Sequence, residues 1–165
     1  MFTPWAKNDP EPSGKDQTPY PAASVANALI AEAARRGKAL THIEIQKLAY
    51  ICHGYALALK NRPLIASHAY AWKYGPVFPT LYSELQRYGA EPITDLLSEP
   101  LQLDPEALEV VRAVMDVYGE YGASKLVEVT HQKGTPWHRS WQANHYSVIP
   151  NPEIRQHYQS LLSKG

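Results

Sequence analysis

Apolar residues recur at the spacing of an α-helix through much of the chain, and strictly alternating apolar and polar residues are scarce. The first periodic stretch begins near Ser24 and stops at Gly37. It is rich in alanine and places Val25, Leu29 and Ala33 on one stripe. This pattern predicts a helix that buries one face.

The second periodic stretch has the strongest helix signal. Thr41 is followed three residues later by Glu44, the spacing of a capping box, in which each side chain accepts a hydrogen bond from the other residue's backbone N–H. Asn61 and Pro63 end the pattern. The apolar residues that recur at helical spacing in between are Ile45, Leu48, Cys52, Tyr55 and Leu59.

Caps and prolines mark the remaining helices, because an N-cap side chain followed by proline is typical of a first helical turn. Residues 64–77 have mixed polarity and predict at most one short β-strand or hairpin. We therefore expect a mainly α fold, a single compact helical domain of six to seven helices over residues 21–165. The further helices run from Pro79 to Gly89, from Asp104 to Gly119, from Tyr121 to Val129, after Thr135 and after Asn151.

The first 20 residues differ in composition from the rest of the chain. They contain four prolines among charged and small polar residues and few apolar groups. Such a segment cannot bury enough apolar surface to offset the entropy of ordering it. We expect residues 1–20 to form a disordered, proline-rich arm.

Composition narrows the functional classes. Sixteen basic residues balance 16 acidic ones, so we expect no nucleic-acid partner from overall charge. The lone cysteine, Cys52, excludes an internal disulfide and fits a reducing cytoplasm, where we expect the protein to lie. No apolar run approaches the roughly 20 residues of a membrane span. We accordingly expect no contact with a membrane.

No pattern of catalytic or metal-binding residues stands out. The seven histidines form no HExxH motif, and His131 and His138 are seven residues apart. We expect no metal, no cofactor and no enzymatic activity, although a histidine-based metal-dependent enzyme remains an alternative. A helical DNA-binding repressor is another. Against it, Arg35, Arg36 and Lys38 lie where positive charge stabilises a helix C-terminus.

Two short segments combine glycine, proline and aromatic residues more densely than ordinary connections do, at positions 71–79 and 130–137. Each ends at the start of a predicted helix, and packing explains at least one of their tryptophans. If the first segment is extended, its side chains alternate, with Lys73 on the open face opposite Trp72 and Tyr74. We assign a structural role to Trp72, Gly75, Pro76, Pro136 and Trp137, and name Lys73, Tyr74, His131 and Lys133 as candidates for contact with a partner.

These segments and two helical motifs together give the chain a family resemblance over roughly residues 24–162. The chain resembles the Panacea antitoxin domain family, which includes SocA-like antitoxins and phage-associated GepA-like proteins. The residues that carry the resemblance are Val25-Ala26-Asn27, Ile45-Gln46-Lys47-Leu48-Ala49-Tyr50, Ala71-Trp72-Lys73-Tyr74-Gly75-Pro76-Val77, Leu126, Thr130-His131 and Pro136-Trp137.

The resemblance implies a helical antitoxin, without catalysis, that neutralises a toxin encoded nearby by direct contact. Members of the family meet toxins of unrelated folds, so the resemblance does not identify the toxin. The proline-rich arm lies outside the family pattern. Its candidate roles are a linker remnant, a partner-specific extension or a degradation handle, and the last would add proteolytic machinery as a partner.

Overall fold

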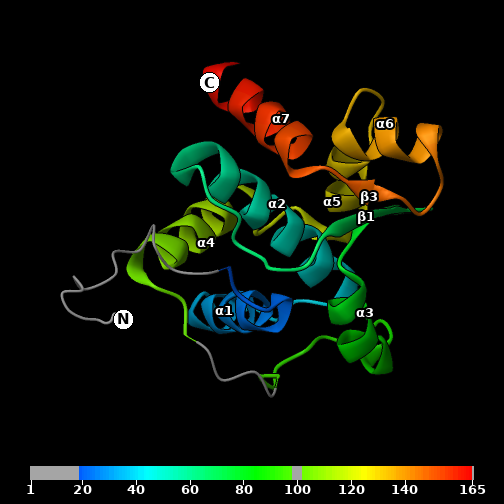
Figure 1. Ribbon diagram of the computed structural model, residues 1–165. Helices are drawn as coiled ribbons and strands as arrows, with labels where there is room; N and C mark the ends of the chain where they lie inside the picture. The colour runs from blue at the N-terminus through cyan, green and yellow to red at the C-terminus, as the bar shows by residue number, and fades with distance from the viewer. Residues whose placement is uncertain (1–18, 98–101, 165) are drawn as a thin grey trace, which may run out of the picture.

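The computed structural model describes residues 19–97 and 102–164, which form seven α-helices and a small sheet that lies to one side of them, beside α5 and α6 (Figure 1). This confirms the expected mainly α class. Residues 1–18 of the expected arm lie outside the described residues. Tyr20 is buried and pairs with Ile65, so the folded region includes this residue. The helices are α1 (Ala22–Arg35), α2 (His42–Lys60), α3 (Pro79–Leu85), α4 (Pro105–Tyr118), α5 (Gly122–Thr130), α6 (Pro136–Ala143) and α7 (Asn151–Lys164), with a 3₁₀ turn at Gln86–Tyr88.

Helix α2 is the centre of the fold and contacts α1, α4, α5 and α7 (Figure 1). The predicted capping box is present: Thr41 N–H donates to Glu44 Oε1 at 2.9 Å, and Glu44 N–H donates to Thr41 Oγ1 at 3.4 Å. The helix ends at Asn61, which has a left-handed φ of 53°. Because α2 is covered on most sides, several of its polar residues are buried along with its apolar ones.

The close crossing of α2 and α7 depends on a glycine. A Cβ atom at Gly54 would lie only 2.2 Å from the ring of Tyr158, so this position has no room for a side chain. Nearby, His53 Nδ1 accepts a hydrogen bond from Ile65 N–H at 3.2 Å, and His53 Nε2 lies 2.9 Å from Asn151 Oδ1. The sequence predicted Asn151 as a cap, but it is the first residue of α7 and its side chain contacts α2.

The sheet contains the hairpin that the sequence allowed and a strand that it did not indicate. Strands β1 (Ala69–Trp72) and β2 (Gly75–Val77) are antiparallel, and β3 (Val148–Ile149) joins the other edge of β1. With two residues, β3 is too short to show alternation. The 71–79 segment therefore supplies the β1–β2 turn, and its last residue, Pro79, is the first residue of α3.

The hairpin corrects the predicted alternation of side chains. Trp72 pairs with Gly75, so Lys73 and Tyr74 form the two-residue turn between the strands. Turn residues do not follow the alternation of a strand, and both side chains are exposed. Lys73 is thus exposed as predicted, but Tyr74 does not share a strand face with Trp72.

The basic cluster at the end of α1 is structural. Glu32, which is buried, binds both Arg35 and Arg36, and these bonds lower its pKa to about 2. Arg36 also donates to Asp116 of α4 at 2.8 Å. These contacts agree with the interpretation of the cluster as a helix-end feature.

Among the described residues, no helix has the length and apolar content needed to cross a membrane.

Candidate functional site

The two glycine- and proline-containing segments meet in the structure. Trp137 Nε1–H, from the start of α6, donates to the backbone oxygen of Trp72 in β1 at 2.6 Å. The His131 ring packs on Trp137, with 4.9 Å between ring centroids. Trp137 is buried and Trp72 is half-buried. Packing thus accounts for Trp137, whereas Trp72 is also open to the surface on one side.

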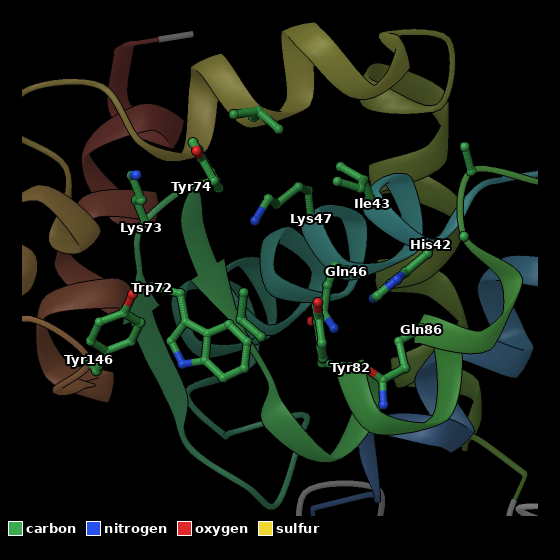
Figure 2. A pocket seen from close by; sticks show the side chains of 14 residues that line it. His42, Ile43, Gln46, Lys47, Trp72, Lys73, Tyr74, Tyr82, Gln86 and Tyr146 are labelled. Carbon is green, nitrogen blue, oxygen red and sulfur yellow. The ribbon is translucent and has the colours of Figure 1, made fainter.

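A pocket of about 590 Å³ lies between α2, the β1–β2 hairpin and α3 (Figure 2). Trp72, Lys73 and Tyr74 line it, whereas His131 and Lys133 do not. The structure therefore divides the four predicted contact residues into two groups. The complete lining consists of His42, Ile43, Gln46, Lys47, Trp72, Lys73, Tyr74, Val77, Tyr82, Gln86, Gly89, Ala90, Val127 and Tyr146.

Lys47 is the most unusual residue of the pocket, because this lysine is only 4% exposed. Its Nζ donates to the backbone oxygen of Pro76 at 3.0 Å. Within the part of the chain that the structure describes, no aspartate or glutamate lines the pocket, and burial lowers the pKa of Lys47 to about 8. The pocket therefore has a buried amine that remains mostly protonated at pH 7.

Gly75 makes room for this amine. Its φ of +121° is one that side-chain-bearing residues rarely adopt, and a Cβ atom there would lie 3.0 Å from Lys47 Nζ. The same Cβ would lie 3.7 Å from His131 Cβ, which places the second segment directly behind the hairpin. The structural role predicted for Gly75 and Pro76 thus includes positioning Lys47.

Gln46 and His42, which lie on α2 with Lys47, complete the floor of the pocket. Gln46 Oε1 accepts from Phe78 N–H at 3.0 Å, which fixes the exit of the hairpin. His42 packs against Tyr82 with 5.0 Å between ring centroids, and its Nε2 is buried without a partner in the described residues. Desolvation and the charge of Lys47 lower the pKa of His42, so its ring is neutral at pH 7.

Aromatic side chains form the rim. The Trp72 ring lies 5.1 Å from that of Tyr82 and 6.3 Å from that of Tyr146. Tyr74 is 67% exposed and Tyr146 is 56% exposed. Lys73 Nζ lies 5.4 Å from the centre of the Tyr74 ring. The rim therefore presents apolar ring surfaces together with the polar hydroxyl, indole N–H and amine groups at the ends of its side chains, as many protein interfaces do.

Sequence reasoning missed most of this site. Lys47 belongs to a motif that carried the family resemblance, but a lysine within a helical pattern gives no sign of its burial. Tyr82 and Tyr146 come from elements far apart in the sequence.

The described residues hold no group of three or more histidine, cysteine, aspartate or glutamate side chains that could bind a metal. Cys52 is fully buried in the core, and burial raises its pKa.

Comparison with known proteins identifies the family. The model of the family described as "Antitoxin SocA-like, Panacea domain" matches residues 45–138, more than half of the chain. The chain belongs to this SocA-like Panacea family. Antitoxin SocA of Caulobacter vibrioides is 34% identical over 138 residues, which cover 76% of this chain and 73% of that protein. No solved structure matches significantly. The matched region of the Panacea family includes both turn segments and Lys47.

Proposed function

We propose that this Panacea protein is an antitoxin that neutralises a protein toxin by direct contact, and that the rim of the pocket is its contact surface. Membership of the family and the similarity to a protein named Antitoxin SocA support the antitoxin role. The observation that carries the proposed surface is the gathering of exposed aromatic and aliphatic side chains around one pocket. The proposal places this action in the cytoplasm.

Four large exposed apolar side chains gather at this site. Ile43, Tyr74, Tyr82 and Tyr146 are each more than one third exposed, and all four line the pocket. A contiguous exposed apolar group of this kind is typical of an interaction site, whereas isolated exposed apolar residues are ordinary. Tyrosine and tryptophan are also favoured as interface anchors. The rim therefore suits a protein partner.

The rim is also partly ordered before any partner arrives. Trp72 is held by Tyr82 on one side and Tyr146 on another, and its backbone oxygen accepts the Trp137 bond. Side chains that are already fixed lose less conformational entropy on binding. Lys73 extends from the turn beside them and gives the rim a positive charge. We expect it to favour an acidic surface on the toxin.

The experiment begins with the open reading frame beside this gene, expressed alone and together with this protein. We expect growth arrest that only co-expression relieves. If co-expression leaves the arrest unchanged, the neighbouring product is not a toxin that this protein neutralises, and the proposal fails for that pair.

Calorimetry with the purified pair then locates the contact. We expect Lys73→Glu to weaken binding roughly tenfold, equivalent to about 1.4 kcal/mol, with an unfolding free energy within about 0.5 kcal/mol of wild type. Tyr74→Ala should weaken binding further, and Lys164→Glu at the far end of α7 is the matched charge control. Wild-type affinity in both hairpin variants would remove the rim from the interface, and Lys133→Glu would then test the second segment.

A further inference from the structure

The buried amine of Lys47 has no negative partner in the described part of the chain. With the described residues its Nζ makes one hydrogen bond, to Pro76 O, although an ammonium group carries three donors. Buried charges in proteins are normally paired, because removing a lone charge from water costs several kcal/mol. Arg62 follows this rule, since it pairs with Asp104 at 2.7 Å. Lys47 is the exception, and it lines an open pocket.

A second unfilled polar group faces the same space. His42 is 7% exposed, and its Nε2 has no hydrogen-bond partner among the described residues. Figure 2 shows the His42 ring and the Lys47 chain both directed into the pocket from α2. A neutral imidazole can carry its proton on Nε2 and donate it. Lys47 and His42 thus offer a cation and a second donor to an acceptor that residues 19–97 and 102–164 do not supply.

The remaining walls select the shape of the occupant. Trp72, Tyr82 and Val77 present apolar surface around the two polar groups, and Gln46 is already engaged by Phe78. A compact anionic group between apolar neighbours would match this arrangement. The anion would accept hydrogen bonds from Lys47 and His42, and its apolar neighbours would pack against the walls of the pocket. The volume of the pocket, about 590 Å³, is in the range of sites that enclose drug-sized ligands, so it has room for an anionic group together with its apolar neighbours.

We propose that the pocket receives the carboxylate of an acidic side chain from the partner protein, with Lys47 as its counter-charge and His42 as a second donor. The exposed tyrosines at the mouth favour a protein source for this carboxylate, and Lys73 beside them adds positive charge along its path. The recognised segment is an aspartate or glutamate flanked by apolar residues. This inference rests on the proposed function, because it assigns chemistry to the same contact surface.

A peptide titration tests the carboxylate without any toxin. The probes are N-acetyl-Leu-Glu-Leu-amide and N-acetyl-Leu-Gln-Leu-amide, which differ only in charge, and the amides of Gly89, Ala90 and Val127 report binding by NMR. We expect the glutamate peptide to bind at least about tenfold more tightly, because the neutral glutamine side chain can accept a hydrogen bond from Lys47 but cannot balance its charge. Equal binding of the two peptides, or no binding of either, would overturn the inference.

Variants show whether Lys47 is responsible. Lys47→Met keeps the length of the side chain and removes its charge, and we expect it to abolish the preference for the glutamate peptide. The matched control is Lys60→Met, the same change on the same helix at a residue that pairs with Glu109 outside the pocket. A Lys47→Met protein that retains the preference would overturn the inference.

If Lys47→Met fails to fold, the pH dependence of glutamate-peptide binding to the wild-type protein tests whether Lys47 pairs with the carboxylate. The other titratable groups around Lys47 are His42 on α2, Lys73 and Tyr74 in the turn, Tyr82 on α3, Tyr146 before β3 and His131 behind Gly75. Because the pKa of Lys47 is about 8, we expect glutamate-peptide binding to weaken at least about tenfold from pH 7 to about pH 9.5. Constant affinity over this range would contradict the inference.

Binding of the neighbouring gene product to wild type and to Lys47→Met distinguishes failure of this inference from failure of the proposed function. If it binds wild type and Lys47→Met equally, the carboxylate inference fails and the antitoxin proposal stands. If it does not bind wild type, the antitoxin proposal fails for that pair, and the peptide comparison still decides the chemistry of the pocket. If removal of residues 1–18 strengthens peptide binding, the arm of this chain competes for the pocket, and a partner carboxylate is not its resident occupant.

Discussion

One methyl group at Gly54 tests how closely α2 and α7 are packed. The Cβ of Gly54→Ala would lie 2.2 Å from Tyr158 Cδ2, 2.3 Å from Cε2 and 2.9 Å from Cγ. Real contacts of this kind are about 3.5–4.0 Å, so the ring or the helix must move by more than about 1 Å. Tyr158 is 3% exposed and packs against Tyr55 and Tyr50, with ring centroids 4.7 and 6.3 Å apart. The ring cannot withdraw without disturbing both neighbours.

Two opposing effects set the size of the change. Replacing glycine by alanine inside a helix stabilises it by about 0.8–1.0 kcal/mol. Overpacking a core costs about 1–3 kcal/mol, and so short a contact belongs at the upper end. We therefore expect Gly54→Ala to lower the unfolding free energy by about 2 kcal/mol. For a domain of this size, the melting temperature should fall by about 4–8 °C.

Guanidinium denaturation followed by far-UV circular dichroism measures this difference. The matched control is the same substitution in a Tyr158→Leu background, where the clash is relieved and Gly54→Ala should become neutral or stabilising. A double-mutant cycle then isolates the coupling between the two positions. If Gly54→Ala alone raises the unfolding free energy by about 1 kcal/mol, as helix propensity predicts, the close packing of α2 and α7 is refuted.

Two further predictions concern buried groups, both measured by chemical denaturation. Trp137→Ala should cost about 3–5 kcal/mol, and half-buried Trp72→Ala should cost less; equal losses would contradict the burial difference. Burial lowers the pKa of His53 to about 4, and the hydrogen bond to Asn151 Oδ1, which favours the protonated ring, offsets only part of this shift. The unfolded chain therefore binds more protons, and stability should fall by about 2 kcal/mol from pH 7 to pH 5; His53→Gln should reduce this slope, and an unchanged slope would exclude His53 as its cause.

The helices were predictable because their signals are local. Thr41 and Glu44 bind each other within one turn, and Asp104 accepts from Ala107 N–H at 2.9 Å, as its position before Pro105 predicted. The hairpin was predictable only as a possibility, since Gly75 and Pro76 limit the backbone without determining its partner. Strand β3 was not predictable, because two residues gain their structure from pairing with Ala69 and Tyr70.

The candidate site was less predictable than the fold. Lys73 and Tyr74 were identified because they sit in a distinctive turn, and the structure places both at the pocket. Lys47 was not, because its burial results from elements that close over it from other parts of the chain, notably Pro76. Tyr146 likewise reaches the rim from the far end of the sequence. Such convergence depends on tertiary packing, which local patterns do not record.

The bond from Trp137 to Trp72 limits how the proposed contact surface can be transferred to another protein. It anchors the β1–β2 hairpin to a helix that lies 65 positions later in the chain, and β3 borders the same strand. A grafted hairpin of residues 69–77 alone would lack both supports. The smallest transplantable unit therefore includes residues 130–149 as well. Within that unit, Lys73 and Tyr74 take no part in strand pairing, so they are the positions at which specificity can be redesigned while the frame stays constant.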